Sequence, residues 1–182
     1  MSNTKLVIGQ IENAPEVNVV YGEKNIFTIE TPEKWINDKD FAQKIGLVCF
    51  FYPEKEKDKL SKNYFYANGI DKENAEETLA DFIEVDLEQF RNKYPDMTFE
   101  TTTVDFSGGL RNGVLFSFSN LNDRFKEEVL YVETDDSFLI FSFAALNSED
   151  YDKYQIVFDD FIDSFNYRGN DPKPFLEYFK SN

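Results

Sequence analysis

The sequence of 182 residues contains no histidine, one cysteine and few basic residues, and each shortage excludes a class of chemistry. Without imidazole there is no Ser-His or Cys-His catalytic pair and no histidine ligand for a metal ion. The lone Cys49 forms neither an internal disulfide nor a thiolate zinc site. It lies within the apolar run 47–52, so we expect a small buried side chain without a redox role.

Positive charge is scarce, with 19 Lys and Arg against 35 Asp and Glu, giving a net charge of −16. A field of this sign repels phosphate backbones and anionic lipid, so we expect no nucleic-acid partner and no membrane-surface binding. This negative charge is consistent with binding to a basic protein partner. It is equally consistent with a domain whose charge serves only to keep it soluble. No apolar run approaches the roughly 18 residues of a membrane-spanning helix, so no integral membrane segment is expected.

Aromatic residues are abundant, with 20 Phe and 10 Tyr, and they predict a core rich in large rings. The length fits one ordinary domain, and a chain of this size buries a core without disulfides or metals. We expect a loosely ordered lead-in over 1–17, a single α+β domain over 18–167 and a tail over 168–182. The composition indicates no oligomeric state.

The first ten residues have neither a basic patch nor an apolar core of the kind found in signal peptides. A cytoplasmic protein is therefore expected if Met1 is the native start. A periplasmic or exported protein is expected instead if a signal peptide was removed from the sequence.

Two stretches have the periodicity of amphipathic helices. Apolar residues recur every three or four positions over 75–94, with Asn74 as the expected N-cap and Glu77 completing a capping box. The same pattern covers 149–165, where Asn147 or Ser148 is the expected N-cap. A short helical piece over 38–44 is stopped by the glycine at 46.

Strand signals fill most of the remaining chain. The apolar stretches 47–52 and 138–145 are typical of strands buried on both faces, and the second is expected at the centre of a sheet. The Thr-rich stretch 98–106 suits an edge, and 134–136 suits a tight hairpin between two strands. Further strands are expected over 18–21, 25–29, 63–68, 114–119 and 125–133. The predicted class is α+β: a mostly antiparallel sheet with helices on both faces, an α/β/α sandwich.

One segment resembles the opening of a known fold group. Residues 27–35, Phe-Thr-Ile-Glu-Thr-Pro-Glu-Lys-Trp, are similar to the Phe-x-Ile-x-x-Pro-x-x-Trp stretch of the PsbP/Mog-type fold. The order of elements over 18–167 is similar as well. The resemblance implies an α/β/α sandwich and binding roles, since the group includes photosystem-associated lumenal subunits, a nuclear import factor that binds the GTPase Ran, bacterial lipoproteins and chaperones for secreted toxins. It supplies no catalytic residues to carry over.

Five residues are candidates for ligand or partner contacts. Arg111 and Arg124 are two of only four arginines, and each either pairs with an acidic neighbour or orients an anionic ligand. Trp35 is a core or rim anchor, or a platform for a ligand. Phe175 and Phe179 in the tail either fold back on the body or mark a partner contact.

The positions of the carboxylates indicate structural roles rather than catalysis or metal binding. Asp135 and Asp136 suit a hairpin turn, and Asp159, Asp160 and Asp163 suit a solvated helix face, because no loop supplies the further oxygens that Ca²⁺ requires. We therefore expect no metal, no cofactor and no catalytic residues.

The leading functional hypothesis is a non-enzymatic binding module that engages a protein partner, a basic one, through an acidic surface. The alternative is a small-molecule or lipid-binding protein of the cell envelope with a ring-lined pocket between sheet and helix. A carboxylate-based hydrolase is the third hypothesis, although the sequence places no acid/base pair for it.

Overall fold

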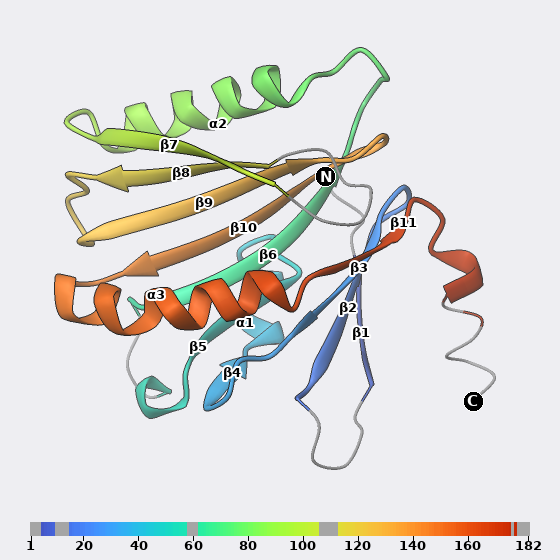
Figure 1. The fold of residues 1–182 in the computed structure, drawn as a ribbon, viewed down its shortest axis with the longest axis horizontal. Helices are drawn as coiled ribbons and strands as arrows, with labels where there is room; N and C mark the ends of the chain where they lie inside the picture. The colour runs from blue at the N-terminus through green and yellow to red at the C-terminus, as the bar shows by residue number, and fades with distance from the viewer. Residues whose placement is uncertain (1–4, 10–14, 58–61, 106–112, 176, 178–182) are drawn as a thin grey trace.

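The computed structural model describes residues 5–9, 15–57, 62–105, 113–175 and 177. In this part of the chain the strands form two antiparallel sheets, and α-helices connect several of the strands (Figure 1). The larger sheet has the order β4-β5-β6-β10-β9-β8-β7 and the smaller one β1-β2-β3-β11. The strands are β1 (Lys5–Gly9), β2 (Val17–Tyr21), β3 (Ile26–Glu30), β4 (Trp35–Asn37), β5 (Cys49–Pro53), β6 (Tyr64–Asp71), β7 (Thr98–Val104), β8 (Gly113–Ser119), β9 (Lys126–Glu133), β10 (Ser137–Ala145) and β11 (Asn166–Gly169).

Helices cover the larger sheet on both faces, which confirms the predicted α+β class. Helix α3 (Ser148–Asp163) packs on β10 from one side, and α2 (Leu79–Lys93) packs on β9 from the other. The short α1 (Lys39–Lys44) packs on β5, and a 3-10 turn, η1 (Glu54–Glu56), follows that strand. Within the described residues, no helix has the length and apolarity needed to span a bilayer.

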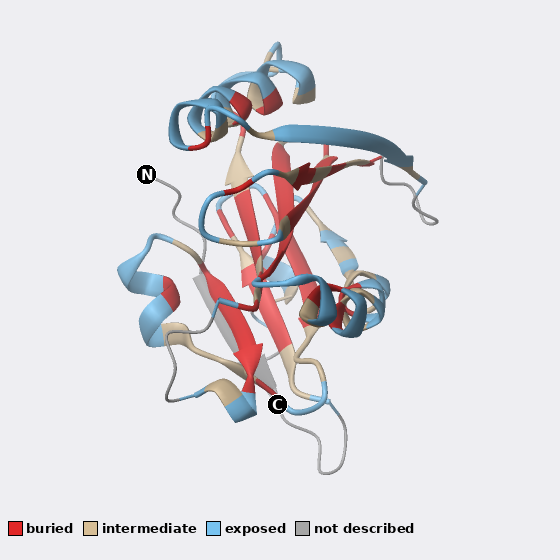
Figure 2. Cartoon of the chain, turned by 90° about the vertical axis from the view of Figure 1, so that its left-hand side faces the viewer, coloured by how far each residue is buried: buried red, intermediate tan, exposed pale blue. Residues whose placement is uncertain are grey.

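The central strand β10 separates two hydrophobic cores. Every residue from Ser137 to Ala145 is buried, as the apolar run predicted, and its neighbours are β6 and β9. Because side chains alternate along a strand, Phe141 and Phe143 enter the core under α3, whereas Ile140 enters the core under α2. Figure 2 shows these buried strands between helices whose outer faces are exposed. At the far edge lies the Thr-rich β7, also as predicted.

The smaller sheet was not predicted as a separate layer. Its strand β1 lies within residues 1–17, where a loosely ordered lead-in was expected, and pairs with β2. Its strand β11 pairs with β3, which lies about 140 residues earlier in the chain. A carboxylate joins the two sheets: Asp71 on β6 accepts hydrogen bonds from Asn25 Nδ2 at 2.7 Å and from Ser137 Oγ at 3.1 Å.

The helix starts follow capping side chains. Asn147, one of the two expected caps, caps α3, and its Oδ1 accepts a hydrogen bond from the Asp150 N–H at 2.9 Å. The predicted start of α2 is wrong by about one turn, because Thr78 caps that helix and accepts from the Asp81 N–H at 3.2 Å. Asn74, the expected cap, instead accepts from the N–H two residues later and forms a turn.

Candidate functional site

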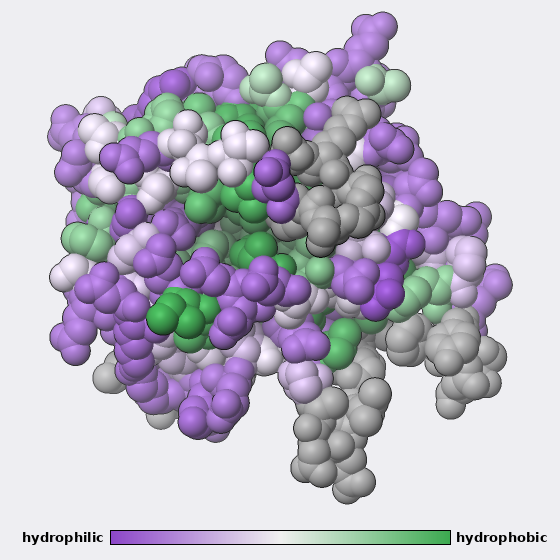
Figure 3. Space-filling model, in the orientation of Figure 1, coloured by the Kyte–Doolittle hydropathy of each residue, from purple (hydrophilic) through white to green (hydrophobic). Residues whose placement is uncertain are grey.

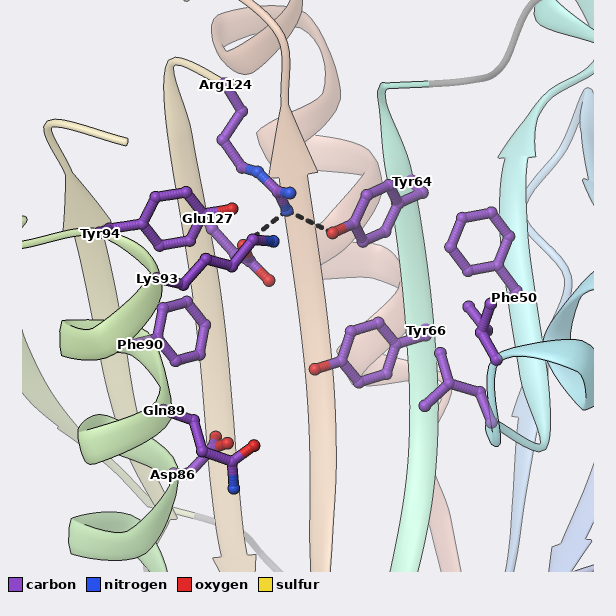
Figure 4. A pocket seen from close by; sticks show the side chains of 12 residues that line it. Phe50, Tyr64, Tyr66, Asp86, Gln89, Phe90, Lys93, Tyr94, Arg124 and Glu127 are labelled. Carbon is purple, nitrogen blue, oxygen red and sulfur yellow. Dashed lines mark hydrogen bonds and ion pairs between the residues drawn. The ribbon is translucent and has the colours of Figure 1, made fainter. Parts of the chain in front are cut away.

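A pocket of about 490 Å³ lies on the α2 side of the larger sheet, between α2 and the segment that follows α1. Strands β10 and β6 cross its floor, and Figure 4 shows α2 on one side and β5 on the other. The residues that line it are Ile45, Leu47, Phe50, Tyr64, Tyr66, Asp86, Gln89, Phe90, Lys93, Tyr94, Arg124 and Glu127.

Strand and helix periodicity bring aromatic rings to both sides of this pocket. Tyr64 and Tyr66 are two residues apart on β6, so both point to the α2 side. Phe50 on β5 lies against Tyr64, with ring centroids 4.9 Å apart. From α2 and its C-cap come Phe90 and Tyr94, one turn apart. The pocket therefore has aromatic rings on both sides, beside the charged or polar side chains of Asp86, Gln89, Lys93, Arg124 and Glu127.

Small side chains on β10 leave room between these rings. Alternation places Ser142 and Ala144 on the α2 side of the strand, in line with Ile140. Both are fully buried, so they form part of the packed floor. A large residue at either position would reduce the space that the rings enclose.

Arg124 organises one end of the pocket. Its guanidinium donates hydrogen bonds to both oxygens of Asp123, at 2.9 and 3.0 Å, to Glu127 Oε2 at 2.7 Å and to the Tyr64 hydroxyl. The guanidinium also lies 5.9 Å from the centre of the Tyr94 ring, and the hydroxyl of that tyrosine donates to Asp123 at 3.0 Å. The hydrogen bond from Arg124 lowers the pKa of Asp123 to about 2. Most of the arginine's donors are therefore engaged within the protein.

Glu127 is a buried carboxylate on the floor, with a side chain that is 6% exposed. One oxygen accepts from Arg124, and the other accepts from Ser142 Oγ at 3.1 Å. Burial raises the pKa of Glu127, while the charge of Arg124 lowers it. The neighbouring Glu128 points to the opposite face of the sheet, where it accepts a hydrogen bond from Tyr151 at 2.6 Å.

Asp86 and Lys93 mark the two ends of the pocket along α2. The hydroxyl of Tyr131 donates to Asp86, and burial raises the pKa of that aspartate. The Lys93 ammonium lies 4.7 Å from the centre of the Tyr94 ring, and Figure 4 shows it close to Glu127. Seven residues separate Asp86 from Lys93, which corresponds to about 10 Å along a helix.

Of the three candidate residues that the structure describes, Arg124 alone lines the pocket. It pairs with acidic neighbours, which was one of the two alternatives for it. Trp35 belongs to the core under α3: it is 8% exposed and stacks on Phe65 with centroids 4.0 Å apart. Phe175 is half-buried and lies under the Arg168 guanidinium at 6.0 Å. Arg111 and Phe179 lie outside the described residues.

The sequence analysis missed Asp86 and Glu127, although both leave a signal. Asp86 lies within the apolar stripe of α2, three residues after Ile83 and four before Phe90, so it must share the face that packs on the sheet. Glu127 lies near the start of a strand whose residues 129–132 are all apolar. A charged residue at a core position indicates either an ion-pair or hydrogen-bond partner or a functional role.

The acidic residues of α3 lie on the opposite side of the sheet from the pocket. Asp152, Asp159, Asp160 and Asp163 are all exposed, and Ile156 among them is 68% exposed. Hydrophilic side chains cover most of this face, while hydrophobic ones gather in the hollow between α3 and the strands above it (Figure 3). Across the described ranges, no three His, Cys, Asp or Glu side chains are grouped so as to hold a metal ion.

Comparison with known proteins identifies the fold. The sequence matches no protein family and no curated protein. The structure is similar to the solution structure of cyanobacterial PsbP (CyanoP) from Synechocystis sp. PCC 6803, with a TM-score of 0.53 and 12% identity over 92% of this chain and 94% of that one. The chain therefore has a PsbP-like fold, as the resemblance of residues 27–35 and the order of elements predicted. At this identity the likeness concerns the fold alone.

Proposed function

We propose that this chain is a non-enzymatic binding module that engages a protein partner, and that the pocket between α1 and α2 receives part of that partner. The observation that supports it is the ring-lined pocket with polar groups held at fixed places. Apolar walls with a few oriented polar groups are typical of recognition sites. Tyr and Phe rings supply large contact areas with little loss of conformational freedom.

The fixed polar contacts favour binding over hydrolysis. Both oxygens of Glu127 already accept hydrogen bonds, from Arg124 and Ser142, and Asp86 accepts one from Tyr131. A glycosidase needs two carboxyl groups that flank the scissile bond, one of them able to give and take a proton. A carboxylate held by an arginine and a serine is better suited to positioning neighbouring side chains than to exchanging protons.

The charge of the chain favours a basic partner. With −16 overall, the protein attracts cationic surfaces over several ångströms and accelerates their encounter. Because exposed charges are screened by salt, association of this kind weakens as the ionic strength rises. Salt sensitivity therefore distinguishes an acidic module from one that binds only through an apolar surface.

Affinity capture from the native lysate tests the proposal, with a pocket-filling variant beside a matched control. Gln89→Trp places an indole at the pocket wall, whereas Glu88→Trp places one on the adjacent exposed position of α2, which does not line the pocket. We expect a stoichiometric partner with the wild type and with Glu88→Trp at low salt, and its loss with Gln89→Trp or at high salt. A partner that Gln89→Trp retains would place the binding surface elsewhere.

A small-molecule or lipid ligand of the cell envelope is the second candidate, because about 490 Å³ lies within the range of small-ligand pockets. Thermal-shift measurements over a panel of lipids and metabolites test it. A hit that raises the melting temperature of the wild type but not of Gln89→Trp would support this function. A flat response across the panel would count against it.

A further inference from the structure

The two carboxylates that line the pocket differ in how their charge is balanced. Glu127 has the Arg124 guanidinium 2.7 Å away. Asp86 accepts a hydrogen bond from the neutral Tyr131, and no cation among the described residues forms an ion pair with it. The pKa of Asp86 is raised by burial and lowered only by that hydrogen bond, so the carboxylate stays uncompensated in a half-buried place.

Aromatic rings surround this uncompensated end. Tyr66 on β6 and Phe90 on α2 line the pocket beside Asp86, and Figure 4 shows the Tyr66 hydroxyl pointing across the floor toward α2. A ring face attracts a cation, and more strongly where water is excluded. The same pocket already contains three such contacts at its other end, where Arg124 lies over the rings of Tyr64 and Tyr94 and Lys93 lies over Tyr94. The Asp86 end has the rings and the carboxylate, but among the described residues no cation pairs with that carboxylate.

We propose that the Asp86 end of the pocket binds the ammonium group of a lysine side chain presented by the partner protein. The inference rests on the proposed function for the location of the binding site. A lysine suits the site because its four-carbon stem is apolar and its charge is compact. The stem lies among the rings, and the ammonium pairs with Asp86. The overall charge of −16 brings a basic segment to this surface.

Lys93 does not oppose this arrangement strongly. It lies two helical turns from Asp86, roughly 10 Å away along the helix. This is the end of the pocket where the carboxylates of Asp123 and Glu127 pair with the Arg124 guanidinium. At that separation, its repulsion of a bound ammonium through bulk water amounts to about a twofold change in affinity. Lys93→Gln should therefore strengthen lysine binding slightly, an effect that a purely structural role of Lys93 would not produce.

Amide chemical-shift titrations of the full chain test the proposal with two peptide probes, Gly-Gly-Lys-Gly-Gly and the same peptide with norleucine. We expect the lysine peptide to bind about tenfold more tightly and to shift residues of β6 and α2 around the pocket. Asp86→Asn keeps the oxygen that accepts from Tyr131 but removes the charge, so it should abolish this preference. Glu88→Gln removes an exposed acid from the same helix and should leave it unchanged.

The outcomes separate the inference from the proposed function. If norleucine binds in the pocket as tightly as lysine, the pocket is a binding site but the cation assignment is wrong. Equal losses in Asp86→Asn and Glu88→Gln would also overturn it, because general charge would then explain the binding. If neither peptide shifts pocket residues and Gln89→Trp leaves partner capture intact, the proposed function fails at this location and the inference fails with it.

Discussion

Removing the Arg124 guanidinium is the sharpest test of which interactions stabilise the pocket. Arg124→Met keeps an apolar stem of similar length but deletes every donor of the side chain. Glu127 then loses its cation in a buried place, Tyr64 loses a hydrogen bond, and Asp123 loses a bidentate contact. The exposed fractions of the Arg124 and Glu127 side chains are 12% and 6%, so water replaces these contacts poorly.

The expected loss follows from that burial. Breaking a buried ion pair by removing one partner lowers the free energy of unfolding by about 3–5 kcal/mol, because the remaining charge is uncompensated. Asp123 adds little, since its side chain is 48% exposed and water can hydrate it. The double variant Arg124→Met with Glu127→Gln leaves no buried charge, so it should recover most of the loss. We expect a coupling energy of about 2 kcal/mol or more between the two sites.

Urea unfolding followed by circular dichroism measures these differences. Arg91→Met is the matched control, because Arg91 pairs with Glu84 on the exposed side of α2, with side chains 48% and 67% exposed. That control should lose less than about 1 kcal/mol. Equal losses in Arg124→Met and Arg91→Met, or a double variant no more stable than Arg124→Met, would refute the buried-pair argument.

The pH dependence of the same variant has a definite sign. Burial already raises the pKa of Glu127, and loss of the Arg124 charge removes the larger of the two positive charges that lower it. Only Lys93 then remains among the described cations that line the pocket, so the pKa rises further. A carboxyl whose pKa is raised in the folded state keeps its proton there at a pH where the unfolded chain has lost it. The stability of Arg124→Met therefore falls as the pH rises from the ordinary glutamate pKa through the raised one. Its deficit against the wild type should be smaller near pH 5 than near pH 8.

Three further predictions concern single side chains. Cys49 is fully buried and burial raises its pKa to about 12, so iodoacetamide should label it only in unfolded protein; fast labelling of the folded protein would contradict its placement. Thr78→Ala should lower the free energy of unfolding by about 1 kcal/mol and Asn74→Ala by clearly less, because Thr78 caps α2; similar losses in urea titrations would contradict that cap. Burial raises the pKa of Tyr131, so its contribution to stability is complete below about pH 10 and is lost as the pH rises further. Urea midpoints from pH 8 to 11 should fall less steeply in Tyr131→Phe than in the wild type, and parallel slopes would contradict this.

Local sequence patterns predicted the structure correctly where a segment's own residues determine whether it is buried or exposed. The apolar run of β10 has no polar face to turn toward water, so it must lie at the centre of a covered sheet, and it does. The Thr-rich β7 can only be half covered, and it forms the edge. The cap of α3 at Asn147 was equally predictable, because a cap and the N–H groups that it satisfies are three residues apart.

Pairing between strands that are far apart in the chain could not be predicted from the sequence. Nothing near residues 166–169 indicates that they form β11 beside β3, because strand partners are chosen by tertiary packing and not by local preference. In the structure Phe165 packs on Phe27 with ring centroids 5.4 Å apart, which brings the two segments together. The pocket was unpredictable for the same reason. Its residues come from β5, β6, α2, β9 and the loops beside α1, α2 and β9, and only the folded sheet places them side by side.

Stability alone does not account for the buried charges of the pocket. Apolar side chains of similar volume in place of a buried ion pair are often neutral or stabilising, so folding alone does not require Arg124 and Glu127 at this position. What the pair does provide is position: one guanidinium fixes the Tyr64 hydroxyl and, through Asp123, the Tyr94 hydroxyl. These rings belong to opposite walls of the pocket, one on β6 and one at the end of α2. We infer that the ion pair sets the separation of the two walls and so keeps the pocket accessible to a ligand.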